Sequence, residues 1–172
     1  RFTAAEFDQL FLENYARIVS AAFRLTGDAD EADDLASEAF WKLWQTPPRR
    51  NENLLGWLYR VVTNLGYNRM RSSRRRTGYE EISLRQELDV ETGGGPEEQV
   101  ILNQERAVVR SILKVMPRRE VQILILRACD LSYKEIAESL RIAPGSVGTL
   151  IARAERKFNS LYTRGEKHAP ES

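Results

Sequence analysis

The sequence predicts an all-α protein made of two small helical domains joined by a flexible acidic linker. Apolar residues recur at intervals of three and four along both halves of the chain, which is the period of an amphipathic helix. Between the halves lies an acidic segment that contains Gly93–Pro96 and lacks a sustained apolar stripe. We therefore expect one domain over residues 1–77, a linker over 78–97, a second domain over 98–163 and a tail over 164–172.

Three helices are expected in the first half of the chain. Helical spacing runs from Phe7 to Gln45, and the residues TGD at 26–28 break it into two helices, the second of which begins among acids that favour a helix N-terminus. A loop is expected over residues 46–53, because two prolines and two asparagines cannot continue a helix. The third helix is expected from Leu54 to about Arg76.

The second half is expected to be helical throughout. Helical periodicity resumes at Val100 and continues through Val115, and a turn is expected at MPRRE, residues 116–120. The run VQILILRAC, residues 121–129, is rich enough in β-branched residues to suggest a strand. With no second strand to pair with, we interpret it as a helix.

A helix, a tight turn and a second helix are predicted over residues 131–158. Ser132 and Glu135 have the spacing of a capping box, and Pro144 suits the first turn of the second helix. This is the shape that places a helix in the major groove of DNA. The outer face of the second helix carries short polar groups followed by cations: Ser146, Thr149, Arg153, Arg156 and Lys157. A helical hairpin inside an ordinary α-domain is the alternative.

The third helix is the second candidate nucleic-acid surface. Its apolar side is Trp57, Leu58, Val61, Val62 and Leu65, and its expected outer side is Arg60, Thr63, Asn64, Tyr67, Asn68 and Arg71. Asparagine and threonine can read base edges, tyrosine can stack on an unpaired base, and arginine neutralises phosphate. The preceding polar loop could cradle a flipped base, although most such loops are only connectors.

The second helix has the composition of a protein-binding surface. Carboxylates lie beside Trp41 and Trp44, and two tryptophans three residues apart are difficult to bury together in so small a domain. Either tryptophan alone could equally be a core residue.

Charge is segregated along the chain despite a net charge of only +1. Six acids and no base lie between Asp28 and Glu38, whereas six arginines and no acid lie between Arg60 and Arg76. Acids dominate again over residues 80–98. Blocks of opposite sign suggest separate surfaces for separate partners, although a single block of this kind is usually only a solvated face.

The composition also limits the function. No apolar run is long enough to cross a membrane and no signal peptide is expected, so we expect a cytoplasmic protein. Cys129 is the only cysteine, which excludes an internal disulfide, and we expect it to be a small core residue.

No catalytic motif is present. His168 is the only histidine, and the chain contains no glycine-rich phosphate loop and no nucleophile motif. We therefore expect no enzymatic activity and no cofactor. The acids Asp30, Asp33, Asp34 and Glu38 lack the pattern of a calcium loop, so no bound metal is expected either.

Together these segments resemble the extracytoplasmic-function (ECF) group of the bacterial sigma-70 family, over nearly the whole chain. GDADEADDLASEAFWKLW is similar to the family's core-polymerase-binding helix, and GWLYRVVTNLGYNRMR is similar to its minus-ten helix. MPRREVQILILR, followed by LSYKEIAESL and GSVGTLIARA, resembles its minus-thirty-five domain. Each motif is degenerate, but their order and spacing make the combination specific.

The resemblance implies an RNA polymerase sigma factor, which binds core RNA polymerase, recognises minus-ten and minus-thirty-five elements and promotes promoter melting and transcription initiation. Its sigma-two domain would bind the clamp helices of the polymerase β′ subunit through Asp30, Asp33, Asp34, Leu35, Phe40 and Trp44. The melted minus-ten strand would contact Asn51, Asn53, Arg60, Asn64, Tyr67, Asn68 and Arg71. The sigma-four domain would lie on the β flap and read minus-thirty-five duplex through Ser132, Tyr133, Ser146, Thr149, Arg153, Arg156 and Lys157. An anti-sigma factor is a further implied partner.

Two residues depart from the family pattern. The positions of Gly148 and Leu150 commonly carry cations in the family, so phosphate contacts should be weaker here and the minus-thirty-five preference altered. Two other functions stay open on the residues alone. One is a helix-turn-helix repressor or activator whose N-terminal domain is a sensor or dimeriser, and the other is an anti-sigma or adaptor protein that only binds polymerase.

Overall fold

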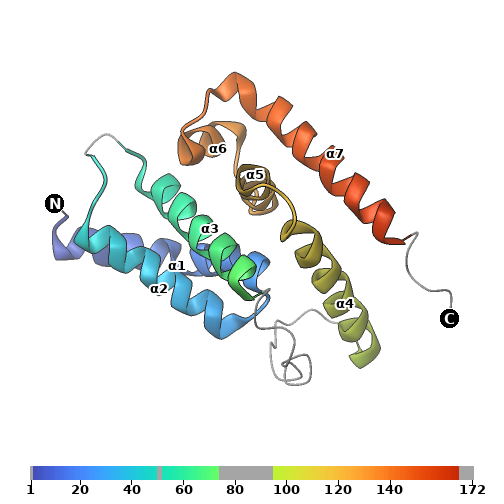
Figure 1. Cartoon of the computed structure of the whole chain (residues 1–172). Coiled ribbons are helices and arrows are strands. Elements are labelled where there is room, and N and C mark those ends of the chain that lie inside the picture. The colour runs from blue at the N-terminus through green and yellow to red at the C-terminus, as the bar shows by residue number, and fades with distance from the viewer. Residues whose placement is uncertain (1, 50–51, 74–94, 167–172) are drawn as a thin grey trace.

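The protein is described by a computed structural model that covers residues 2–49, 52–73 and 95–166. Within these ranges it is entirely helical, with seven α-helices, one 3-10 turn and no strand (Figure 1). The elements are α1 (Ala4–Thr26), α2 (Ala29–Gln45), α3 (Leu54–Ser73), α4 (Pro96–Leu113), α5 (Arg118–Ala128), α6 (Tyr133–Leu140), η1 (Pro144–Ser146) and α7 (Val147–Glu166). The predicted all-α fold is confirmed.

Helices α1, α2 and α3 form the N-terminal half of the molecule, and their ends follow local chemistry. Thr3 and Glu6 make a capping box at the start of α1. Gly27 ends α1 in the left-handed conformation with φ 68°, which glycine adopts without steric cost. The side chain of Asp28 then accepts a hydrogen bond from the Glu31 amide and begins α2. The predicted break at residues 26–28 is therefore confirmed.

The core of this half lies where the apolar stripes of the three helices meet. α1 packs against both α2 and α3, and α2 packs against α3. Gly66 allows a close approach, since a Cβ atom there would lie 2.8 Å from Leu25 Cδ1. The largest side chains buried in this core are Ile18, Leu25, Leu35, Phe40, Leu43, Leu58 and Tyr59.

Helices α4 to α7 form the C-terminal half, in which α6, η1 and α7 make the predicted helix-turn-helix. Ser132 and Glu135 form the expected capping box, and Pro144 occupies the first position of η1, directly before α7. The interior is built of Val121, Ile123, Leu126, Ile136, Leu140, Val147, Ile151 and Ala154. The run at 121–129 is helical as interpreted, and Cys129, the C-cap of α5, is half-buried and packs against the edge of the core.

Several expected boundaries shift. α4 begins at Pro96 and not at Val100, because proline suits the first helical position and two glutamates follow in the first turn. Residues 96 and 97 of the expected linker are therefore helical. α5 already begins at Arg118, and α7 continues through Glu166. Residues 74–94, which contain the rest of the linker and the expected end of the third helix, lie outside the described residues.

The two halves pack against each other. α3 lies against α5 and α6, while α1 contacts α4 and α5 (Figure 1). The buried apolar residues form one continuous cluster that includes both halves. This packing determines which of the predicted surfaces are open to a partner.

Candidate nucleic-acid and partner interfaces

The outer face of α7 is open to solvent. Ser146, Thr149, Arg153 and Arg156 are exposed, as the helical spacing predicts, while Val147, Ile151 and Ala154 anchor the opposite face. Lys157 is also exposed, and its Nζ lies 3.6 Å from the Glu120 carboxylate. The helix presents short polar groups near its N-terminus and cations further along, which suits insertion into a major groove.

Tyr133 extends this face onto α6. Its side chain is 48% exposed, and the Arg127 guanidinium lies 5.7 Å from the centre of its ring. The ring also lies beside Gly148, where an added Cβ atom would be 3.4 Å from the tyrosine Cε2. The residue that departs from the family pattern therefore leaves the aromatic ring uncovered on its α7 side.

An aromatic groove lies between α1 and α2. Trp41 and Trp44 are 58% and 46% exposed, which agrees with the prediction of a protein-binding surface. The Phe7 ring lies 5.0 Å from the Trp44 ring in an edge-on arrangement, and Phe11 continues the groove. Exposed aromatic side chains of this kind are frequent anchors of protein–protein interfaces.

Acids flank this groove on α2. Asp30, Asp33 and Asp34 are exposed, as predicted, and the Tyr15 hydroxyl donates a hydrogen bond to Asp33 Oδ1 at 2.8 Å. Both Leu35 and Phe40 are only 2% exposed. The prediction of Leu35 as a surface contact is therefore wrong, whereas Phe40 lines the floor of the groove. They belong to the stripe of α2 that faces α1 and α3, and they support the surface from beneath.

The predicted outer face of α3 is covered by the C-terminal half. Tyr67 is only 3% exposed, and its hydroxyl donates a hydrogen bond to the Met116 carbonyl at 2.9 Å. Thr63 is fully buried. The expectation that these side chains face solvent is wrong, because α5 packs on the side of α3 that helical periodicity leaves polar.

Two side chains of α5 bind this polar face directly. The Gln122 amide donates hydrogen bonds to Asn64 Oδ1 at 3.0 Å and to Thr63 Oγ1 at 3.1 Å. The Arg118 guanidinium donates to Asn68 Oδ1 at 2.7 Å and lies 5.2 Å from the centre of the Tyr67 ring. Sequence reasoning did not find either residue, although their spacing of four places both on one face of α5, which was a usable signal.

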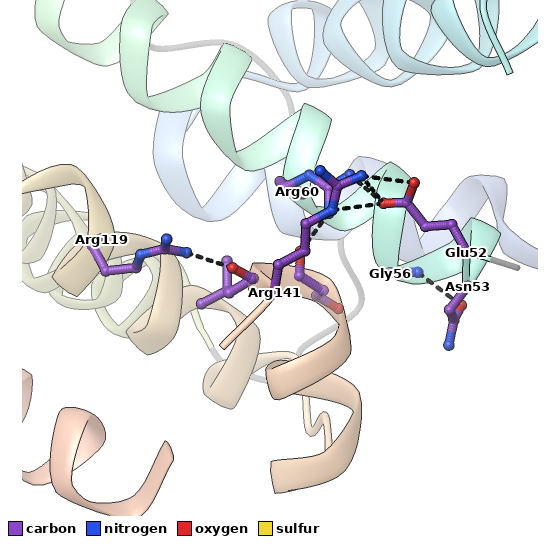
Figure 2. A network of polar contacts seen from close by, with 8 residues as sticks. Glu52, Asn53, Gly56, Arg60, Arg119 and Arg141 are labelled. Carbon is purple, nitrogen blue, oxygen red and sulfur yellow. Dashed lines mark hydrogen bonds and ion pairs between the residues drawn. The ribbon is translucent and has the colours of Figure 1, made fainter. Parts of the chain in front are cut away.

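A second cluster joins the loop before α3 to α6 (Figure 2). Glu52 forms ion pairs with Arg60 of α3 and with Arg141 at the end of α6, the latter at 2.7 Å. Burial alone would raise the pKa of Glu52, but hydrogen bonds from the two guanidinium groups outweigh it and lower that pKa below the ordinary value. Glu52 therefore remains ionised in this cluster at neutral pH.

Two of the remaining predicted minus-ten residues, Asn53 and Arg60, lie at this cluster, and Arg71 lies at the other end of α3. The side-chain Oδ1 of Asn53 caps α3 by accepting a hydrogen bond from the Gly56 amide, while its Nδ2 donates to Glu138 at 2.7 Å. The Arg60 guanidinium also donates to the Ser139 carbonyl at 3.1 Å. Arg71 is exposed, with its guanidinium 3.0 Å from the Tyr67 hydroxyl. Asn51 lies outside the described residues.

The sequence of the chain is similar to those of known proteins of one family. Residues 10–76 match the family model of sigma-70 region 2, and residues 106–158 match that of sigma-70 region 4. The ECF RNA polymerase sigma factor SigW of Bacillus subtilis is 30% identical over 147 residues, which is 80% of this chain and 78% of that protein. The ECF RNA polymerase sigma factor SigE of Mycolicibacterium smegmatis is 27% identical over 96% of this chain and 63% of its own length.

Solved structures show the same fold. The sigma factor RpoE, in complex with the anti-sigma factor NepR from Bartonella quintana, aligns with a TM-score of 0.58 at 20% identity over 92% of this chain and 97% of its own. CnrH, in complex with the cytosolic domain of CnrY, aligns with a TM-score of 0.60 at 21% identity over 94% of this chain and 90% of its own.

The two region matches, in this order on one chain, define a sigma-70-type transcription initiation factor. The protein belongs to the ECF group of RNA polymerase sigma factors. In the part of the chain that the structure describes, no helix is both long and apolar enough to span a membrane.

Proposed function

We propose that this chain directs core RNA polymerase to promoters in the bacterial cytoplasm and takes part in opening them, acting by binding and not by catalysis. The observation that carries this proposal is the open helix-turn-helix. Its N-terminal capping box is intact, and the outer face formed by Ser146 of η1 with Thr149 and Arg153 of α7 is exposed. Such a face can read a duplex minus-thirty-five element while its cations contact phosphates.

The polymerase contact is assigned to the surface between α1 and α2. Trp41 and Trp44 offer large exposed rings, and Asp30, Asp33 and Asp34 add negative charge nearer the N-terminus of the same helix. This combination suits the β′ clamp helices, with aromatic anchors at the centre and charge at the rim. Leu35 supports this surface from beneath, and Phe40 lines the floor of the groove.

The minus-ten strand is assigned to α3 and the loop before it. Asn53, Arg60, Asn64, Tyr67, Asn68 and Arg71 supply amide, aromatic and guanidinium groups along one side of α3. These groups can hydrogen-bond and stack on unpaired bases, so capture of a melted strand would stabilise an open duplex without ATP. We further propose an anti-sigma factor as a partner, because the sigma factor RpoE, which shares this fold, was solved in complex with the anti-sigma factor NepR.

Run-off transcription on a promoter library tests the proposal. Purified core polymerase should start at new, discrete sites only when this chain is added. Replacing Trp44 and Asp33 with alanine should reduce those transcripts by at least ~10-fold, since aromatic anchors each contribute on the order of 2 kcal/mol to binding.

Glu13→Ala is the matched control, because Glu13 is an exposed acid of α1 outside the aromatic groove. It should leave transcription unchanged. The absence of core-dependent transcripts, together with tight duplex binding by the chain alone, would instead support a helix-turn-helix repressor or activator.

A further inference from the structure

Polar contacts join the N-terminal and C-terminal halves along one side of α3. We call this region the interdomain seam, and define it as the contacts of residues 52–71 with α5, α6 and the residues that flank them. At one end Glu52 bridges Arg60 and Arg141 (Figure 2). Further along α3, Gln122 and Arg118 bind Asn64 and Asn68, and the Tyr67 hydroxyl binds the backbone of Met116.

The seam uses the residues assigned to the minus-ten strand. Asn53 binds Glu138, Arg60 binds the Ser139 carbonyl, and the amide oxygens of Asn64 and Asn68 accept from α5. A hydrogen-bonding group that is occupied by α5 or α6 is not available to a base. The two kinds of contact therefore exclude each other at these side chains.

The close packing of α3 against the C-terminal half also leaves no room for a nucleotide. A Cβ atom on Gly56 would lie 3.2 to 3.4 Å from three atoms of Ser139, so α3 and α6 approach to within backbone contact. Only 3% of the Tyr67 surface stays exposed to solvent, because the C-terminal half covers this side chain. No nucleotide fits between helices at this distance.

We propose that this structure is a self-blocked state, in which the α5–α6 surface occupies the minus-ten site and competes with single-stranded DNA for it. Opening the seam is then required before α3 can capture a melted strand. The identity of the competitor rests on the proposed function, whereas the seam itself rests on the contacts above.

The composition of the seam suits a reversible contact. The Glu52–Arg141 pair is exposed on the arginine side, where the side chain retains 64% of its accessible surface. Partly exposed ion pairs are weak and screened by salt. Polymerase or an anti-sigma factor could therefore shift the balance between closed and open states by binding one of them preferentially.

Arg141, which takes part in the interdomain seam, has a strained backbone conformation. It ends α6 in the left-handed conformation with φ 55°, where glycine is the common residue. This conformation accompanies an arginine side chain that binds Glu52 with two nitrogen atoms. Such strain at a non-glycine residue persists where the surrounding contacts support it.

Two variants with opposite changes of charge separate the proposal from simple electrostatics. Glu52→Gln removes an acid and Arg141→Gly removes a cation while relieving the backbone strain. Competition predicts that both tighten the binding of fluorescently labelled single-stranded DNA of random sequence by about 2- to 5-fold, because loss of a partly exposed ion pair raises the open fraction. Charge alone predicts opposite changes, and that result, or unchanged binding, overturns the proposal.

Glu31→Gln is the matched control for the loss of an acid. Glu31 pairs with Arg69 at 3.4 Å within the N-terminal half, away from α5 and α6. It should leave the radius of gyration in solution scattering unchanged, whereas both seam variants should increase it. A radius that stays at the wild-type value in both seam variants would contradict the open state.

A cross-link tests the block directly. Glu52→Cys and Arg141→Cys in a Cys129→Ser chain can be joined by a bis-maleimide with a reducible disulfide spacer. The joined chain should lose single-stranded DNA binding and core-dependent transcription, and reduction of the spacer should restore both. A joined chain that still binds DNA and initiates contradicts self-blocking and leaves the proposed function intact. A chain that initiates in neither form contradicts the proposed function.

Discussion

Single residues determine where helices end and how closely they pack. Gly27 is the clearest case, because its positive φ of 68° terminates α1 and brings the Arg110 guanidinium against the backbone. An added Cβ atom would lie 2.3 Å from the arginine Cζ. The glycine therefore permits both the turn into α2 and the contact between α1 and α4.

Gly27→Ala should lower the free energy of unfolding by about 1–2 kcal/mol, because an L-residue is strained in the left-handed region. Displacement of Arg110 adds to this loss. Urea unfolding followed by circular dichroism measures the change. Gly95→Ala is the control, since nothing lies within 4 Å of a Cβ atom there. Equal stability of the two variants would contradict the assigned role.

Gly148 gives the opposite expectation. Its φ is not positive, and an added Cβ atom would meet only Tyr133 Cε2, at 3.4 Å, which is an ordinary contact. Gly148→Ala should raise stability by about 0.5–1 kcal/mol, because glycine is unfavourable inside a helix. Thermal unfolding should show a higher Tm, and a lower one would mean that the Tyr133 ring needs the space.

At the scale of the helices, the packing of α5 on α3 cannot be predicted from the sequence of α3 alone. The polar side of α3 reads as a solvent-facing nucleic-acid surface, yet Thr63 and Tyr67 on that side are buried against α5. The physical reason is that hydrogen bonds from Gln122 and to the Met116 carbonyl satisfy the buried polar groups. Periodicity detects apolar stripes and does not detect polar surfaces that satisfy each other.

The ion-pair cluster at Glu52 has a defined dependence on pH. Its pKa lies below the ordinary value of 4.5 because Arg60 of α3 and Arg141 of α6 stabilise the carboxylate against the effect of burial. The cluster should therefore contribute fully above about pH 4.5 and weaken as pH falls through the lower pKa of the folded state. Solution scattering should show a constant radius from pH 5 to pH 8.

Below about pH 4 the radius should rise in the wild-type chain, as the cluster is lost. Glu52→Gln should remove that part of the acid dependence, since the glutamine does not titrate. A change of radius between pH 6 and pH 7 would contradict this account, because Glu52 does not change its charge there.

At the scale of the whole molecule the two halves share one buried apolar cluster. Each half is small, and small domains gain stability when they bury surface against a neighbour. The joining surface combines buried side chains with partly exposed ion pairs, so it can hold the halves together and still separate.

Urea unfolding of the wild-type chain should therefore follow one cooperative transition. A variant that forces α6 away from Gly56, such as Ser139→Leu, should separate it into two transitions with a lower first midpoint. Ser160→Leu, at an exposed position of α7, is the control and should keep a single transition. Two transitions in the wild-type chain would show that the halves fold independently.

The sequence by itself determined the helices, their caps and the family. The helical period of apolar residues, the capping box at Ser132 and the break at Gly27 each involve only a few neighbouring residues. They can therefore be recognised without knowing the fold. The exposed faces of α7 and α2 followed for the same reason. Only the tertiary structure decided that Leu35 and Phe40 are buried and that α5 covers the polar side of α3. The packing of α5 and α6 on α3 depends on Glu52, Arg118, Gln122 and Arg141 meeting partners that lie far away along the chain, and no local pattern specifies such meetings.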